Sequence, residues 1–344
     1  MNTTLSWKDF IATFPAKSLS EGSENMACRL MDLSHLGLIS IPGEDSQTFL
    51  QGQLSCDLDQ LTDDHCLLGS LSTPKGRLVS TLTVAKLNNT VHLLLHKDLI
   101  TNVSQVLGKY IVFSKAKLED QSDKLICFGL SGVQAENTLS ELLTAPINDY
   151  DISQNHNLHC VKIPGSIPRY LIVAPLENAR EAWAVLAKSS TISNGAQWLL
   201  ENIEAGIAEI SASTKEQFLP HNLNLHLTDG VNFEKGCYTG QEVIARMHYR
   251  AKLKSELLIC ELESSDNKAP VLANLDGAAI RSIENRNLGE VINAAAFKNG
   301  CIKALALLPK NENDKDLRPL KVLINNQEFN LNKVELPPYA INNE

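Results

Sequence analysis

The segment NFEKGCYTGQE, residues 232–242, places an amine, a thiol and a carboxylate close together, on Lys235, Cys237 and Glu242. A thiol does nucleophilic, redox or metal-binding chemistry as the thiolate, so its surroundings decide whether it is functional. Gly236 and Gly240 flank this thiol without side chains, which allows a tight turn and the close approach of a ligand. Cys237 is therefore a candidate for chemistry.

The residues after Cys237 predict a helix. Thr239 and Glu242 have the T-x-x-E spacing of a capping box and precede apolar residues at helical spacing, so we expect a helix that begins at Thr239. Unpaired amide groups and the helix dipole would then stabilise a thiolate at Cys237, and Lys235 would add positive charge. Alternatively, Cys237 packs inward, Glu242 merely caps and Lys235 is a solvated surface charge. The residues alone leave these two interpretations balanced.

A basic run, ARMHYRAKLK at residues 245–254, follows without any acidic residue between Glu242 and Glu256. A phosphate or polycarboxylate partner could use such a run. Arg246 and Arg250, four positions apart, can also simply complement the C-terminal end of the helix. Taken alone, the run favours this second account.

Composition limits the classes of function. A chain of 344 residues with a formal net charge of −9 has room for two or three domains, and its charge opposes general binding to nucleic-acid phosphates. No apolar run approaches the roughly 18 residues of a membrane span, and the first residues do not resemble a secretion leader. We expect a cytoplasmic monomer with no membrane contact.

The other potential metal ligands and catalytic patterns do not form a site. Eight cysteines are scattered without a C-x-x-C pair, and a reducing compartment disfavours disulfides. QNHNLHC, residues 154–160, invites a metal interpretation, but His159 and Cys160 would point to opposite faces of a strand. The chain contains neither G-x-S-x-G nor H-E-x-x-H. We therefore predict no metal site and no hydrolase site.

The predicted helices and strands that must position residues 232–242 indicate an α+β fold. Strands and helices alternate without a regular βαβ period up to about residue 250, and only short alternating apolar runs follow residue 255. The later runs predict a small antiparallel barrel or sandwich. The principal expectations are a strand at 33–43 followed by a helix, a meander at 66–97, helices at 98–109, 133–143 and 177–188, strands at 110–118 and 124–132, a hairpin within 157–174, and an amphipathic helix at 194–206.

KGCYTGQEVIAR, residues 235–246, closely resembles the signature of the YgfZ family, folate-binding proteins related to the aminomethyltransferase (T-protein) of the glycine cleavage system. FLQGQLSCDL, LSTPKGRLVSTL, KYIVFSKAKL, QWLLENIEAGIAEI and QFLPHNLNL extend the resemblance over most of residues 33–255. It implies two α+β folate-binding domains, at 1–145 and 146–250, and a C-terminal barrel at 251–344. It also implies tetrahydrofolate or a one-carbon derivative as cofactor.

The resemblance assigns roles to particular residues. Trp198 matches the family's folate-contacting indole, and the alternative is a core tryptophan. Glu204 matches the position that holds the pterin, where a carboxylate accepts from adjacent N–H groups; the alternative is a solvated glutamate. The signature adds further cofactor-binding candidates: Tyr238, Gln241, Glu242 and Arg246. An aromatic residue common near the first strand is here Leu36, so one wall of the implied pocket departs from the family pattern.

The same comparison separates enzyme from non-enzyme. The related T-proteins rely on an aspartate in the strand after the glycine-rich turn, yet no Asp or Glu occurs from His65 through Lys97. The T-proteins, in turn, lack the cysteine of this signature. The resemblance therefore implies a folate-binding accessory protein for iron–sulfur client enzymes, including tRNA-modifying ones, with Cys237 and Lys235 at the functional centre. The alternatives are a folate-dependent aminomethyltransferase, a scaffold with a structural Cys237, and direct tRNA binding, which the acidic charge disfavours.

Overall fold

A computed structural model describes residues 6–15, 27–265, 275–297, 301–310 and 320–341. Two compact units divide these residues. Unit 1 comprises residues 1–46, 60–67 and 83–198, and unit 2 comprises residues 47–59, 68–82 and 199–344. The three-domain division at residues 145 and 250 stays a prediction.

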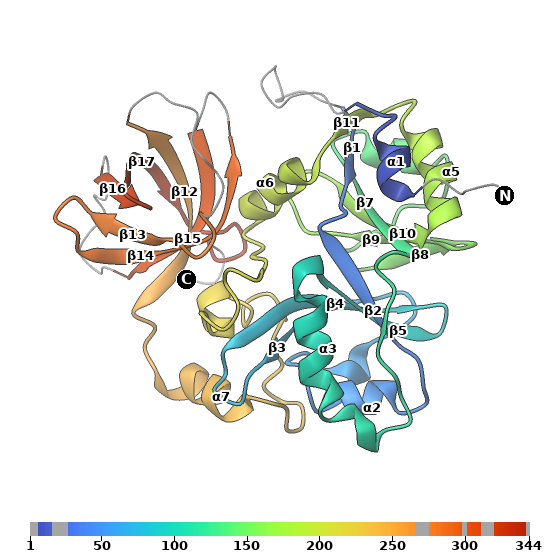
Figure 1. Cartoon of the computed structure of the whole chain (residues 1–344), viewed down its shortest axis with the longest axis horizontal. Helices are drawn as coiled ribbons and strands as arrows, with labels where there is room; N and C mark the ends of the chain where they lie inside the picture. Colours follow the sequence, from blue (N-terminus) through green and yellow to red (C-terminus); the bar gives the residue numbers. More distant parts are fainter. Residues whose placement is uncertain (1–5, 16–26, 266–274, 298–300, 311–319, 342–344) are drawn as a thin grey trace. The chain divides into compact units, whose positions relative to one another are not determined.

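A six-stranded sheet forms the centre of unit 1 (Figure 1). Its strands follow the order β11 (Thr191–Ser193), β1 (Arg29–Asp32), β7 (Leu125–Ser131), β10 (Arg169–Pro175), β9 (Leu158–Lys162) and β8 (Ile152–Asn155). The β1–β11 pair is parallel, whereas the other paired neighbours are antiparallel. The expected hairpin within 157–174 is confirmed as β9 and β10.

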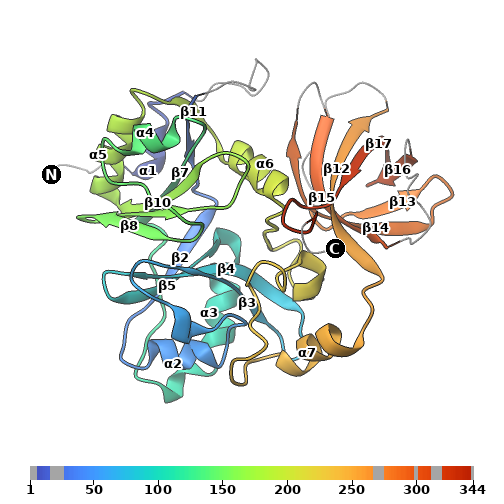
Figure 2. The same ribbon diagram turned by 180° about the vertical axis from the view of Figure 1, so that it is seen from behind.

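Helices α1 (Trp7–Ile11), α4 (Ala135–Leu139) and α5 (Leu176–Leu186) pack on this sheet (Figure 2). Trp7, Phe128 and Trp183 meet in their shared core, with the Trp7 and Trp183 ring centroids 5.5 Å apart. These aromatic side chains bury large apolar areas, which stabilises the layer of helices against the sheet.

A second sheet follows the order β3 (Leu67–Ser72), β4 (Leu78–Leu87), β5 (Thr90–His96), β2 (Leu36–Ile41) and β6 (Glu119–Asp120). The predicted meander at 66–97 is confirmed as β3, β4 and β5. The strand before it begins with Leu36, and the expected helices appear as α2 (Ser46–Gln51) and α3 (Ile100–Gly108). Short 3₁₀ turns, η2 (Leu58–Gln60) and η3 (Lys97–Leu99), complete this region.

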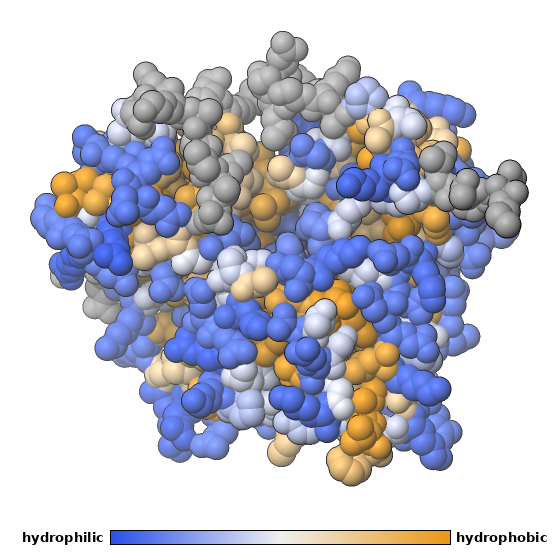
Figure 3. Space-filling model, in the orientation of Figure 1, coloured by the Kyte–Doolittle hydropathy of each residue, from blue (hydrophilic) through white to orange (hydrophobic). Residues whose placement is uncertain are grey.

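The predicted strand at 110–118 is wrong. Residues Ile111–Phe113 form a 3₁₀ turn, η4, closed by the Ser114 amide donating to the Ile111 carbonyl at 2.9 Å. Ile111 is buried but Val112 and Phe113 are exposed, so most of the apolar run that suggested a strand does not face the core. Figure 3 shows apolar surface over the region of α3 and this turn. The only pairing here among the described residues is the two-residue β6.

The C-terminal strands form a closed barrel in the order β12 (Ser255–Ser264), β15 (Cys301–Pro309), β14 (Asn287–Ala296), β13 (Ala279–Ser282), β16 (Leu320–Ile324) and β17 (Gln327–Glu335). Leu258, Val291, Ile302 and Phe329 lie in its core. The expected α+β architecture with a C-terminal barrel is confirmed. None of the described helices is long and apolar enough to cross a membrane.

Candidate functional site

Cys237 is the exposed cysteine of the chain. Of the eight cysteines, six are buried, Cys301 is intermediate and Cys237 alone is exposed. Burial raises the pKa of Cys56 and of Cys127 to about 12, so both thiols are protonated and unreactive at neutral pH. The alternative in which Cys237 packs inward is wrong. Accessibility therefore distinguishes this one thiol from the other seven.

Helix α7 (Gln241–Arg250) begins two residues later than expected, and the predicted capping box is wrong. Its N-cap is Gly240, with a φ of +86° and no side-chain cap. A Cβ on Gly240 would lie 2.6 Å from the Thr73 carbonyl oxygen, so backbone packing selects glycine and moves Thr239 out of the capping position. Thr239 instead lies with its hydroxyl 3.3 Å from Gln53 Oε1.

Glu242 and Arg246 pair on the outside of α7. Arg246 Nη2 donates to Glu242 Oε1 at 2.7 Å in an exposed i, i+4 ion pair. Gln241, the first helical residue, donates its amide to the Tyr238 carbonyl at 3.2 Å and is half-buried. The two charged side chains are thus accessible to a ligand, and their mutual attraction is weak because water surrounds both.

Lys235 is buried, with 9% of its surface exposed. Its Nζ donates to the Leu54 carbonyl at 2.9 Å and to the Cys56 carbonyl at 2.5 Å. Burial lowers its pKa, while the two carbonyl acceptors satisfy part of the ammonium. The alternative of a solvated surface lysine is wrong. The hydrogen bonds of its ammonium group tie the signature to residues 54–56.

Tyr238 provides a second buried side chain in the segment, with 7% of its surface exposed. The Lys235 Nζ lies 5.3 Å from the centre of its ring, and burial raises the pKa of its phenol to about 12. Its hydroxyl has no hydrogen-bond partner among the described residues. Two buried side chains thus bracket the exposed Gly236 and Cys237 and hold them at the surface.

The polypeptide leading into the signature is held to the same part of unit 2. Asn232 donates its amide to the Ser55 carbonyl at 2.9 Å, and its Oδ1 accepts from the amides of Glu234 and Lys235 at 2.8 and 2.9 Å. Ser55 Oγ donates to the Gly230 carbonyl at 2.6 Å. The two bonds to Asn232 Oδ1 form an Asx-type turn directly before the buried Lys235.

Trp198 and Glu204, the candidates for pterin recognition, both lie on α6 (Gly195–Ala205). Trp198 is buried, and the guanidinium of Arg169 lies 4.5 Å from its ring centroid. A Cβ on Gly129 would lie 2.7 Å from Trp198 Cε3, so the indole fits closely against β7. Trp198 is therefore part of the core of unit 1, with a cation on one face.

Glu204 forms an ion pair with Lys303 of the barrel, Oε1 to Nζ 2.8 Å. The lysine side chain is 12% exposed and its Nζ also lies 4.0 Å from the centre of the Phe297 ring, whereas the glutamate side chain is 36% exposed. Glu204 is thus a partly accessible carboxylate with a fixed cationic partner. The alternative of a merely solvated glutamate is wrong.

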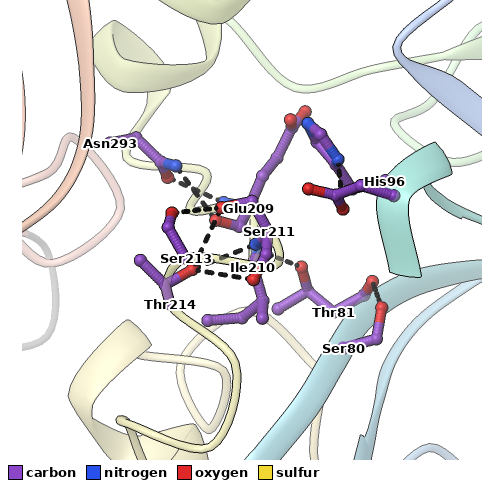
Figure 4. A network of polar contacts seen from close by, with 10 residues as sticks. Ser80, Thr81, His96, Glu209, Ile210, Ser211, Ser213, Thr214 and Asn293 are labelled. Atoms are coloured by element: carbon purple, nitrogen blue, oxygen red, sulfur yellow. Dashed lines mark hydrogen bonds and ion pairs between the residues drawn. The ribbon is translucent and has the colours of Figure 1, made fainter. Parts of the chain in front are cut away.

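A polar network fixes the chain after α6 (Figure 4). Glu209 donates its amide to Asn293 Oδ1 at 2.9 Å, and Asn293 Nδ2 donates back to the Glu209 carbonyl at 3.0 Å. Ile210 donates its amide to Thr81 Oγ1 at 3.1 Å. Asn202 Nδ2, on α6, donates to Glu209 Oε1 at 2.7 Å. Side chains of the barrel and of β4 therefore hold the backbone that follows Glu204.

Sequence reasoning missed two partners of the candidates. Lys303 is a lone lysine in the apolar run CIKALALL, and a charge in a buried barrel strand is itself a signal that a partner is needed. Arg169 directly follows the hairpin turn, where a charged residue is not unusual, so the sequence does not indicate that it needs a partner. Its partner, Trp198, is distant in sequence.

Comparisons with known proteins agree on one relationship. Residues 23–164 match the family model described as GCVT N-terminal domain. The chain is 31% identical over 288 residues to tRNA-modifying protein YgfZ of Yersinia pseudotuberculosis, covering 83% of this chain and 86% of that protein. The protein of that name from Yersinia enterocolitica is 31% identical over 297 residues, with coverages of 86% and 88%.

A solved structure extends the comparison to the fold. The crystal structure of glycine cleavage system aminomethyltransferase T from Bartonella henselae superposes with a TM-score of 0.70 at 15% identity, covering 90% of this chain and 86% of that one. At this identity the likeness concerns the fold alone. The expected T-protein-like architecture is confirmed.

Proposed function

Because the chain belongs to the YgfZ family, we propose that it is a tetrahydrofolate-binding accessory protein that supports the assembly or repair of iron–sulfur enzymes, and thereby tRNA modification. Cys237 is its functional thiol. The observation that carries the proposal is the exposure of Cys237: it is the one exposed thiol among eight, and it lies between the buried residues Lys235 and Tyr238. A thiol that served only packing would be buried.

Four observations support folate as the cofactor. The sequence resemblance implies that the matched domain family and the T-protein fold belong to folate-dependent proteins. The carboxylate of Glu204 is accessible enough to accept hydrogen bonds from adjacent pterin N–H groups. The buried Tyr238 hydroxyl lacks a partner among the described residues, which suits a ligand that supplies one. Arg246, exposed on α7, can bind the carboxylate of a folate tail, with Gln241 and Glu242 beside it.

Trp198 fits less simply. Its ring already contacts Arg169 and β7, so a pterin that stacks on the indole must use the edge or face that these groups leave, or displace Arg169. A bound folate would supply a carrier for one-carbon units. The chain's own contribution is to bind and orient it and to present the thiol.

Calorimetric titration with tetrahydrofolate tests the cofactor. We expect stoichiometric binding that Glu204→Gln weakens at least about tenfold, because the charge-assisted hydrogen bonds are lost. Glu181→Gln, an exposed glutamate on α5, is the matched control. Equal affinities for Glu204→Gln and the parent chain would remove Glu204 from the site.

Complementation of a strain that lacks the protein tests the thiol separately. Cys237→Ala is expected to keep folate binding and stability but to lose function. Full function of Cys237→Ala would make the protein a scaffold.

An aminomethyltransferase is the second candidate, and the T-protein fold favours it. The sequence from His65 through Lys97, which includes β3, β4 and β5, carries no carboxylate to polarise the folate nitrogen. Incubation with tetrahydrofolate and aminomethylated carrier protein decides between the two. Robust turnover would establish the transferase.

A further inference from the structure

Three aromatic rings of unit 2 meet between helix α7 and the segment that precedes Lys235. His248 stacks on Phe233 at a centroid distance of 3.9 Å and an interplanar angle of 17°. Tyr249 stands nearly perpendicular to both rings, at 6.0 Å from Phe233 with an angle of 69° and at 4.8 Å from His248 with an angle of 80°. Neither the thiol nor the proposed folate ligands account for these rings.

Tyr249 is the ring that a ligand can reach. It is 68% exposed, whereas Phe233 is half-buried. Because Phe233 and His248 stack on each other and both stand across the phenol ring, they lie on the same side of it, and its opposite face is covered by neither. An exposed aromatic ring that its neighbours hold in place is typical of a binding surface, because a ligand that stacks on it removes apolar area from water.

Exposed positive charges follow Tyr249 along the chain. Arg250, Lys252 and Lys254 are exposed, and none of them forms an ion pair within the part of the chain that the structure describes. The barrel adds another lysine, since Lys310 donates its amide to the Lys254 carbonyl at 2.8 Å and is also exposed. Four cations thus lie on or beside the chain that follows Tyr249.

The end of the helix does not explain these charges. Helix α7 ends at Arg250, and Ala251 has an extended backbone with a φ of −106° and a ψ of 141°. A cation in the last turn complements the helix dipole, which can account for Arg250. Lys252 and Lys254 lie beyond the last turn, where the influence of the dipole fades. Another partner is therefore needed to explain them.

The charge along this stretch is positive although the chain is acidic. No Asp or Glu occurs between Glu242 and Glu256. Glu242 is paired with Arg246 at 2.7 Å, and Glu234, next to Phe233, is exposed. The formal net charge of −9 opposes binding of a polyanion over the general surface, so a polyanion that binds this protein must use a local surface such as this one.

We propose that Tyr249, Arg250, Lys252, Lys254 and Lys310 form a binding surface for single-stranded nucleic acid. A base stacks on the phenol ring, and the guanidinium and ammonium groups bind the adjacent phosphates. Single strands fit this surface because their bases are free to stack on a side chain, whereas the bases of a duplex are stacked on each other. The contact goes beyond the proposed function, in which the effect on tRNA modification is indirect, and it does not require folate.

Fluorescence anisotropy with the full-length chain and a short fluorescein-labelled RNA strand of mixed sequence tests the ring. Tyr249→Ala should weaken binding at least about fivefold, because stacking of a single base contributes that much or more. Tyr249→Phe keeps the ring and should bind as the parent chain does. A DNA strand of the same sequence should also bind, because neither stacking nor phosphate pairing uses the 2′-hydroxyl group.

The salt dependence of the affinity tests the cations. Affinity should fall as salt increases, since each phosphate contact releases counterions. Loss of two contacts in the double variant Lys252→Gln/Lys254→Gln should reduce the slope of log affinity against log salt by about 1.4. The double variant Lys124→Gln/Lys188→Gln, at two exposed lysines of unit 1, is the matched control and should keep the slope of the parent chain.

Tyr110→Ala, which removes an exposed tyrosine of unit 1, is the control for the ring and should bind as the parent chain does. Affinity unchanged in Tyr249→Ala would overturn the proposal, as would binding to an RNA duplex as tight as to its single strand. Displacement of the strand by oligoglutamate as effectively as by unlabelled RNA of the same charge would also overturn it, because the surface would then recognise charge without a base.

Discussion

The ammonium of Lys235 lies 5.3 Å from the centre of the Tyr238 ring, and both side chains are buried while the two residues between them are exposed. Lys235 and Tyr238 thus anchor the chain on either side of the exposed residues Gly236 and Cys237. The lysine binds backbone carbonyls of residues 54 and 56, so the position of Cys237 depends on contacts far away in sequence.

Cys237 should be the first thiol to react in the folded chain. With iodoacetamide under native conditions, we expect one rapid modification per chain, because six of the other cysteines are buried and Cys301 is half-buried. Intact-mass spectrometry over time measures the count, and peptide mapping identifies the site. Cys237→Ser should remove the rapid phase. Rapid labelling that persists in this variant would show that another cysteine is the most reactive thiol.

Gly240 and Gly236 should respond differently to alanine. Gly240 has a φ of +86° and would place a Cβ 2.6 Å from the Thr73 carbonyl oxygen, whereas a Cβ on Gly236 meets nothing within 4 Å. We expect Gly240→Ala to lower the free energy of unfolding by about 1–3 kcal/mol through backbone strain. Gly236→Ala should change it by less than about 0.5 kcal/mol. Urea denaturation of the two variants side by side measures the difference, and equal midpoints would refute the argument.

Lys235→Met should destabilise unit 2. The substitution keeps much of the side-chain volume but leaves the Leu54 and Cys56 carbonyls without their donor, which costs about 1–3 kcal/mol. Lys75→Met, at an exposed lysine, is the control. Chemical denaturation measures the loss of unfolding free energy. The alkylation rate of Cys237 should also rise, because the buried lysine no longer anchors the chain beside it. A variant as stable as the control would show that the buried ammonium contributes nothing.

His159 should make unit 1 less stable in mild acid. Burial lowers the pKa of this 2%-exposed imidazole to about 4, with a smaller contribution from His92. Between pH 6.5 and pH 4 the unfolded chain binds a proton that the folded chain does not, so stability is present at higher pH and falls as pH decreases. The loss approaches about 3 kcal/mol at pH 4.

Denaturation midpoints measured from pH 7 to pH 4 check this dependence. His159→Gln should flatten the curve, whereas His156→Asn, at an exposed turn, should leave it unchanged. Parallel curves for His159→Gln and the parent chain would mean that His159 titrates normally.

Local patterns predicted most of the fold. The hairpin at β9 and β10, the amphipathic α6 and the strands of the barrel follow from apolar periodicity and turn residues, which act over a few positions. The strand expected at 110–118 is not formed: Val112 and Phe113 are exposed, and Ile111–Phe113 form a 3₁₀ turn. Propensity indicates what a segment can form, whereas a strand also needs a neighbour.

The sequence marks the candidate site residues but carries less information about their contacts. The signature marked Cys237 and Lys235, yet the capping box at Thr239 was wrong because Gly240 packs against the backbone of residue 73. The pairing of Glu204 with Lys303 and of Trp198 with Arg169 joins positions far apart in sequence. Local spacing carries no information about such partners.

The closed barrel limits how the C-terminal part of unit 2 can meet another protein. In the ring from β12 through β17 each described strand pairs with a neighbour on both sides, so none of these strands has an edge that is wholly unpaired. The closure disfavours binding of a client by extension of this sheet. Recognition on the barrel must depend on side chains and loops, and the same closure protects it from edge-to-edge aggregation.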